Sequence, residues 1–150
     1  MKKSWSMVFS KVDIQFAKDT LQGLTSPDKY LLPKYFYDEK GSRIFQKIMR
    51  MTEYYPTDCE MQVFTSQSSQ ITSEILSGSG YFNLIELGPG DGLKSKILLH
   101  DLMNQNARFA YIPIDISSDA LSGLVNQLES EIPRLLVKAR AGDYFRILKD

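Results

Sequence analysis

A glycine-rich turn between a predicted strand and a predicted helix constrains the fold of this chain most. The run 81–87 is short and nearly continuously apolar, and the three glycines Gly88, Gly90 and Gly92 follow it. An apolar run of this length predicts a strand that is buried in a parallel sheet. Because ligands of open parallel sheets bind beyond the carboxyl ends of the strands, the turn is also the first candidate binding site.

The residues after this turn alternate between helical and strand patterns. The expected elements are, in chain order, a helix over 93–105, a strand over 109–115, a helix from Ser117 or Ser118 to Pro133, a strand over 135–139 and a short helix after Gly142 and Asp143. Strands separated by helices need crossover connections, which favours an α/β fold with a three-stranded parallel sheet of the doubly wound type. Pro113 lacks the N–H of a ladder hydrogen bond, so irregular pairing is expected there.

The first half of the chain has a different, mostly helical pattern. It predicts helices over about 11–23, from Gly41 and Ser42 onward, and after Pro56, where residues 57–60 fit a capping box. The serines and glycines at 77–80 predict a flexible hinge. We therefore expect a helical cap region at 1–77 and the first half of a Rossmann-like binding domain at 81–150.

Composition excludes several classes of function. Eighteen Lys and Arg against eighteen Asp and Glu give a formal net charge of zero in 150 residues, which disfavours nucleic-acid and membrane-surface binding. Cys59 and His100 are the one cysteine and the one histidine, so neither an internal disulfide nor a Cys/His zinc site is expected. We find no signal-peptide pattern and no apolar run long enough to span a bilayer, and expect a soluble, cytoplasmic protein.

The spacing of the glycines favours a ligand other than a dinucleotide. In the dinucleotide motif a third glycine or alanine would stand where this chain has Leu93. Glu86, which precedes the glycines, suits a ligand with an ammonium group or hydroxyls. S-adenosylmethionine (SAM) has a cationic sulfonium and an amino-acid end, and is the cofactor that we predict. The alternative is an ordinary tight turn between a strand and a helix.

Three further positions are candidate ligand contacts. Asp115 ends the second predicted strand, where an acid can accept hydrogen bonds from ribose hydroxyls; its alternative role is to cap the next helix. Gly142 and Asp143 follow the third strand, where a carboxylate could accept from the adenine amine or only cap a helix. Lys94 is predicted in a first helical turn, where an anion such as a ligand carboxylate would be favourable; the alternative is a solvated lysine.

Several blocks of the sequence resemble the histidine-specific SAM-dependent methyltransferase family. The blocks are 35–45, 53–57 together with Glu60, 86–94 and 111–117. The resemblance implies donor contacts at Gly88, Lys94, Asp115 and Asp143. It also implies that Tyr54 lies near the donor and the acceptor and that Tyr37 faces the acceptor, which makes these two the candidate catalytic residues. We interpret Tyr35 and Tyr55 as core aromatics.

The resemblance implies an enzyme that methylates the α-amino group of L-histidine or a related amino acid. Family members are longer than 150 residues, so we expect this chain to be an amino-terminal portion with an incomplete acceptor site, inactive alone. A SAM-binding module without catalysis is the alternative, and a nicotinamide-binding domain is disfavoured by the glycine spacing. With further strands missing, the first strand would be an exposed edge, through which we expect a homodimer.

Overall fold

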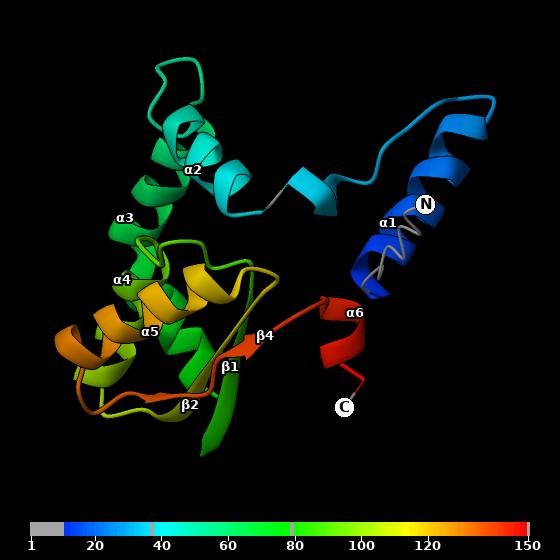
Figure 1. The fold of residues 1–150 in the computed structure, drawn as a ribbon. Helices are drawn as coiled ribbons and strands as arrows, with labels where there is room; N and C mark the ends of the chain where they lie inside the picture. Colours follow the sequence, from blue (N-terminus) through cyan, green and yellow to red (C-terminus); the bar gives the residue numbers. More distant parts are fainter. Residues whose placement is uncertain (1–10, 37, 79, 150) are drawn as a thin grey trace, which may run out of the picture. The chain divides into compact units, whose positions relative to one another are not determined.

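The computed structural model describes residues 11–36, 38–78 and 80–149 and divides the chain into two compact units, Met1–Tyr37 and Asp38–Asp150 (Figure 1). The second unit contains the sheet, and it also contains the helices between residue 38 and the predicted hinge at 77–80. The functional division into a cap region at 1–77 and a binding half at 81–150 therefore stays a proposal.

The first unit is a helix with a returning segment. Helix α1 (Lys11–Thr25) confirms the predicted helix and runs two residues past Gly23, and the 3-10 helix η1 (Pro33–Phe36) follows. The Asp19 carboxylate accepts hydrogen bonds from the Tyr35 hydroxyl at 2.6 Å and forms an ion pair with Lys34 at 2.8 Å. Tyr35 is half-buried and packs edge-on against Phe16, which is 47% exposed, so Tyr35 does not belong to the buried core that its interpretation as a core aromatic implied.

Lowering the pH is expected to loosen this unit through Asp19. Hydrogen bonds from Lys34 and Tyr35 hold the pKa of the Asp19 carboxyl at about 2, below its ordinary 3.8. A lowered folded pKa stabilises the folded state above the unfolded pKa, and this contribution is lost as the pH falls from 3.8 toward 2. NMR titration of the full chain should show the contact breaking near pH 2. A midpoint at 3.8 would contradict it, and Asp28→Asn, at an exposed position, should leave the midpoint unchanged.

Two helices precede the sheet in the second unit. Helix α2 (Glu39–Ile48) begins earlier than expected because the Asp38 side chain caps it, accepting from the Gly41 N–H at 2.7 Å. Helix α3 (Pro56–Leu76) begins at Pro56, with Tyr55 as an N-cap that makes no side-chain hydrogen bond. The predicted capping box at 57–60 is therefore wrong: the fixed φ of proline starts the helix, and residues 57–60 lie inside it.

The sheet confirms the predicted parallel α/β arrangement. Strand β1 (Tyr81–Leu87) pairs in parallel with β2 (Arg108–Asp115), and helix α4 (Ser95–Asn104) is the crossover between them. Helix α5 (Ser118–Glu131) leads from β2 to the third strand position, and β2 lies in the middle of the described sheet, paired with β1 on one side.

The third strand position is occupied by two short strands that both pair with β2. β3 (Leu136–Val137) lies inside the predicted strand at 135–139, whereas β4 (Arg140–Ala141) begins one residue beyond its predicted end. The Tyr111 carbonyl accepts a hydrogen bond from the Lys138 N–H, and the Asp115 carbonyl accepts one from the Gly142 N–H. Because every second residue of a strand directs its backbone groups to the same side, the backbone of Pro113 also faces this side of β2. Proline has no N–H to donate, which explains the interruption between β3 and β4 and confirms the irregular pairing expected at Pro113. Pairing with β1 continues past this point, with Glu86 opposite Pro113.

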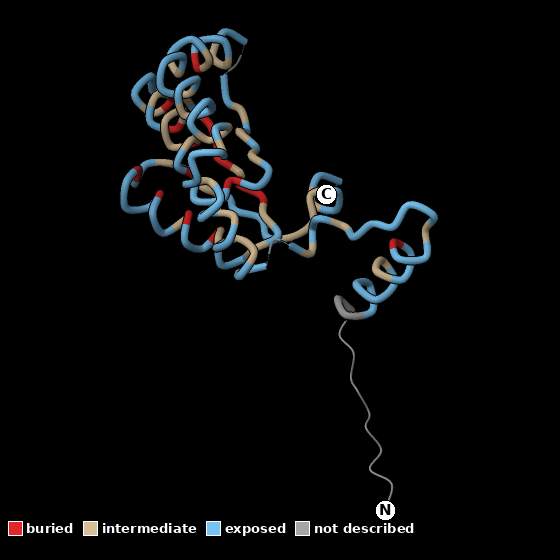
Figure 2. The backbone as a smooth tube through the Cα atoms, turned by 90° about the horizontal axis from the view of Figure 1, so that it is seen from above, coloured by how far each residue is buried: buried red, intermediate tan, exposed pale blue. Residues whose placement is uncertain are grey.

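The core lies where β2, α4 and α5 meet. Figure 2 shows the buried stretches of backbone, and the buried cluster comprises Leu99, Leu102, Phe109, Tyr111, Leu124, Leu128 and Ile132. Helix α3 packs along α4, and the buried Thr72 hydroxyl donates to the Asp101 carboxylate at 2.6 Å. None of the described helices is long and apolar enough to cross a membrane. In the described part of the chain, no group of three or more His, Cys, Asp or Glu is placed to hold a metal ion.

Candidate functional site

The ends of the strands are joined by hydrogen bonds into one row. The Gly88 N–H donates to the Ile114 carbonyl, and the Gly142 N–H donates to the Asp115 carbonyl, each at 2.8 Å. Three of the predicted site residues, Gly88, Asp115 and Gly142, therefore lie side by side at the carboxyl edge of the sheet. This is the edge at which open parallel sheets bind their ligands.

The glycine turn has a backbone that other residues rarely adopt. Gly88, Gly90 and Gly92 have φ angles of 66°, 59° and 68°, in the left-handed region. A Cβ on Gly92 would lie 2.3 Å from the Leu124 Cδ1, whereas a Cβ on Gly90 would meet nothing within 4 Å. Gly92 is thus needed for packing against α5, and Gly90 leaves open space beside the backbone that a ligand could approach.

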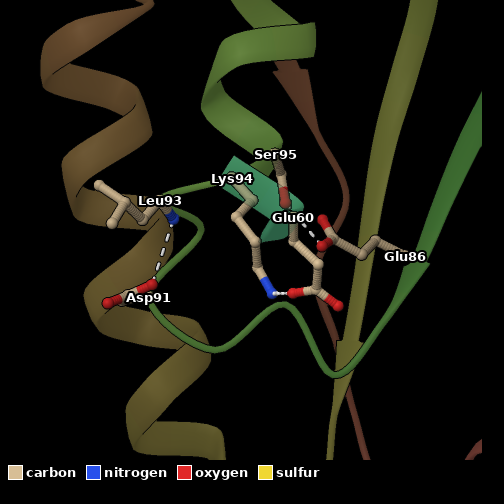
Figure 3. A network of polar contacts seen from close by, with 6 residues as sticks. All are labelled: Glu60, Glu86, Asp91, Leu93, Lys94 and Ser95. Atoms are coloured by element: carbon tan, nitrogen blue, oxygen red, sulfur yellow. Dashed lines mark hydrogen bonds and ion pairs between the residues drawn. The ribbon is translucent and has the colours of Figure 1, made fainter. Parts of the chain in front are cut away.

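Glu86 is committed to contacts inside the protein. Its Oε1 accepts from the Ser95 hydroxyl at 2.6 Å (Figure 3). Its Oε2 accepts from the Tyr111 hydroxyl. Burial, and next the Glu86 carboxylate, raise the pKa of Tyr111 well above its ordinary value, so its hydroxyl stays a donor. Glu86 therefore ties β1 to the first residue of α4 and to β2. A ligand contact by Glu86 stays a prediction.

Lys94 lies at the junction of the glycine turn and α4. It is the N-cap residue rather than a member of the first turn, and its Nζ forms an ion pair with Glu60 of α3 (Figure 3). Its position at a helix start beside the glycine turn agrees with the predicted role of binding an anion. Its side chain is 36% exposed, so the alternative of a solvated surface lysine is not contradicted. Ligand binding by Lys94 stays a prediction.

Both predicted aspartates have local contacts. Asp115 accepts from the Ser117 N–H at 2.9 Å, and Ser117 itself caps α5, so Asp115 is not the helix cap. Asp143 caps helix α6 (Tyr144–Ile147), accepting from the Phe145 N–H at 2.9 Å. Each of these contacts uses the Oδ1 atom. Ribose binding by Asp115 and adenine binding by Asp143 remain predictions that this geometry permits.

The tyrosines before α3 differ in exposure. Tyr54 is half-buried, with its ring edge-on to Phe45 at 5.8 Å between centroids. Tyr55 is 69% exposed, so its interpretation as a core aromatic is wrong. Tyr37 lies outside the described residues. A catalytic role for Tyr54 or Tyr37 remains a prediction.

A comparison with protein families decides between the ligand classes that the turn leaves open. The family model described as histidine-specific methyltransferase, SAM-dependent, matches residues 16–150. The chain belongs to this family. The glycine turn and the hydrogen-bonded row of strand ends agree with a family that depends on SAM. The family is one of enzymes, and its methyl donor is SAM.

Curated relatives of this chain carry names that agree with the family. The histidine N-alpha-methyltransferases of Mycolicibacterium smegmatis and Mycobacterium tuberculosis are 35% and 32% identical to it over 127 residues, which cover 85% of this chain. The ergothioneine biosynthesis protein 1 of Schizosaccharomyces pombe is 28% identical over 75% of this chain and 15% of its own length. The chain spans 38% of the length of the two mycobacterial relatives.

Two residues beside the candidate site, Tyr144 and Glu60, were not among the site residues predicted from the sequence. A Cβ on Gly88 would lie 3.0 Å from the Tyr144 hydroxyl, so α6 brings this tyrosine to the glycine turn. Glu60, interpreted as part of a capping box, contacts Lys94 instead. The aromatic residue after Asp143 was a visible signal for Tyr144. The partner of Glu60 had no local signal, because the two residues are 34 positions apart.

Proposed function

We propose that this chain forms the donor-binding half of a methyltransferase that acts on the α-amino group of L-histidine or a related amino acid. The observation that carries the proposal is the hydrogen-bonded row of strand ends, which sets Gly88, Asp115 and Gly142 beside each other. In this arrangement Asp115 binds the ribose hydroxyls, Asp143 the adenine amine and Lys94 the carboxylate of the amino-acid end. The proposed acceptor follows from the names of the mycobacterial relatives.

The residues of the chain would act by binding and alignment. When bound, SAM supplies a methyl group on a positively charged sulfur. Asp115 and Lys94 would fix the two ends of the donor, so that the methyl group has one orientation toward the incoming amine. Aromatic faces can stabilise the positive charge that an amine gains as it is methylated. Tyr54, half-buried before α3, and Tyr37 are the candidates for this contact.

Calorimetry with S-adenosylhomocysteine and with NAD tests the ligand class. We expect S-adenosylhomocysteine, a stable analogue of the donor with a neutral sulfur, to bind. We expect NAD not to bind, because Leu93 stands where the dinucleotide motif needs a small residue. Binding of NAD in preference would contradict the proposal.

The proposal includes the expectation that the 150 residues alone do not complete the reaction. The chain spans 38% of the mycobacterial relatives, so we place the main acceptor-binding groups outside the matched part. Incubation with SAM and histidine, followed by mass spectrometry, should show no methylated histidine. Methylated product would overturn this part of the proposal while supporting the reaction itself. Donor binding without any acceptor activity in a longer form of the protein would favour the non-catalytic module.

We also expect a second copy of the chain to cover β1. The residues Tyr81, Ile85 and Leu87 are 53%, 48% and 49% exposed, and among the described residues β2 is the one strand paired with β1. Apolar edge strands of this kind tend to associate. Sedimentation velocity should show a dimer at high concentration, and Ile85→Lys should shift it toward monomer. A monomer at every concentration would contradict this prediction.

A further inference from the structure

The ion pair between Glu60 and Lys94 joins α3 to the glycine turn. The two side chains come from positions 34 residues apart and meet beside the turn that joins β1 to α4 (Figure 3). They are 53% and 36% exposed, so a ligand in solution can reach both. A lysine ammonium has three N–H donors and a carboxylate has about four acceptor sites, so a mutual contact leaves each able to bind a further group.

The other carboxylates near the turn have different contacts. Both oxygens of Glu86 accept hydrogen bonds from protein hydroxyls. Asp91 accepts from the Leu93 N–H at 3.1 Å, and Figure 3 shows its side chain directed away from Glu60. Of the carboxylates drawn there, Glu60 is the one paired with Lys94.

We propose that Glu60 and Lys94 together bind the zwitterionic amino-acid end of the donor, with Glu60 accepting from its ammonium group while Lys94 binds its carboxylate. The inference rests on the proposed donor site and assigns the ammonium to Glu60 rather than to Glu86, the acid expected from the sequence. A ligand with one positive and one negative group fits an ion pair, since each charge faces its opposite. A ligand with only the negative group would meet repulsion from Glu60.

Glu60→Gln in the full chain separates this role from a structural one. We expect its affinity for S-adenosylhomocysteine to fall about 10-fold, because a hydrogen bond between charged groups is lost. Its affinity for 5′-methylthioadenosine, which has the nucleoside and the sulfur but no amino-acid end, should be unchanged. The analogue of S-adenosylhomocysteine that lacks only the amino group should bind Glu60→Gln at least as well as the parent. Asp58→Asn removes an exposed carboxylate from the first turn of α3, two residues before Glu60, and should bind all three ligands as the parent does.

The outcomes distinguish this inference from the proposed function. Equal weakening of S-adenosylhomocysteine and 5′-methylthioadenosine would show a structural role for Glu60 and overturn the inference alone. Tighter binding of S-adenosylhomocysteine by Glu60→Gln would also overturn it, because Glu60 would then compete with the ligand for Lys94. Absence of binding by the parent chain would overturn the proposed function and the inference with it. Partial retention of affinity in Glu60→Asp, which keeps the charge, would support the inference.

Discussion

Replacing Asp115 by asparagine is expected to weaken the binding of S-adenosylhomocysteine by about 10- to 100-fold. Hydrogen bonds to a charged group are worth about 1.5–3 kcal/mol, and about 1.4 kcal/mol corresponds to a factor of ten. Asparagine keeps an oxygen that can accept from the Ser117 N–H, so the turn before α5 should persist. The loss would then report the contact of the carboxylate with the ribose hydroxyls. Isothermal titration calorimetry measures it directly.

The control for this prediction is Asp119→Asn. Asp119 is an exposed carboxylate in the first turn of α5, close in sequence to Asp115, and its removal should leave the affinity unchanged. Equal melting temperatures for the parent and Asp115→Asn would show that the turn is intact. Parental affinity in Asp115→Asn would contradict the placement of the ribose at the end of β2.

Gly92→Ala is expected to lower the free energy of unfolding by about 3 kcal/mol. An alanine at a φ of 68° costs about 1–2 kcal/mol, and overpacking a filled core costs about 1–3 kcal/mol. The new Cβ would lie 2.3 Å from the Leu124 Cδ1, and Leu124 is only 2% exposed, so its side chain has little room to move. Urea denaturation followed by circular dichroism measures the change.

A second glycine provides the matched control. Gly123 lies inside α5, and a Cβ there would meet nothing within 4 Å. Gly123→Ala should raise the free energy of unfolding by about 0.5–1 kcal/mol, because alanine has less conformational freedom to lose in a helix. Loss of stability on the same scale in both variants would mean that the clash at Gly92 is not its cause.

Local patterns in the sequence predicted most elements of the second unit. The apolar run of β1 and the spacing of apolar residues in α4 and α5 reflect burial, which the structure confirms at Leu99, Leu124 and Leu128. The start of α3 was misjudged because a capping pattern and a proline pointed to N-cap residues two positions apart, and the rigid φ of Pro56 decided it. The third strand was predicted as one piece, since its division depends on Pro113 in the neighbouring strand.

The candidate site was predictable in its backbone and less so in its side-chain contacts. Glycines with positive φ can be expected where a strand turns sharply into a helix, and all three follow this rule. Glu86 was expected to face a ligand, but its oxygens accept from Ser95 and Tyr111. Which acid is committed inside the protein depends on how β1 packs against α4 and β2, and a single sequence does not encode that in any local pattern.

The alternation of strands and helices, the glycine turn and the resemblance to a SAM-dependent family followed from the amino-acid sequence alone. These features depend on backbone preference and on the spacing of apolar residues, both of which are local. The tertiary structure decided which charged groups meet. It pairs Glu60 with Lys94 because α3 packs along α4, and it joins Gly88, Asp115 and Gly142 through the hydrogen bonds of the sheet. Contacts between residues far apart in the chain follow from packing, and the site is made of such contacts.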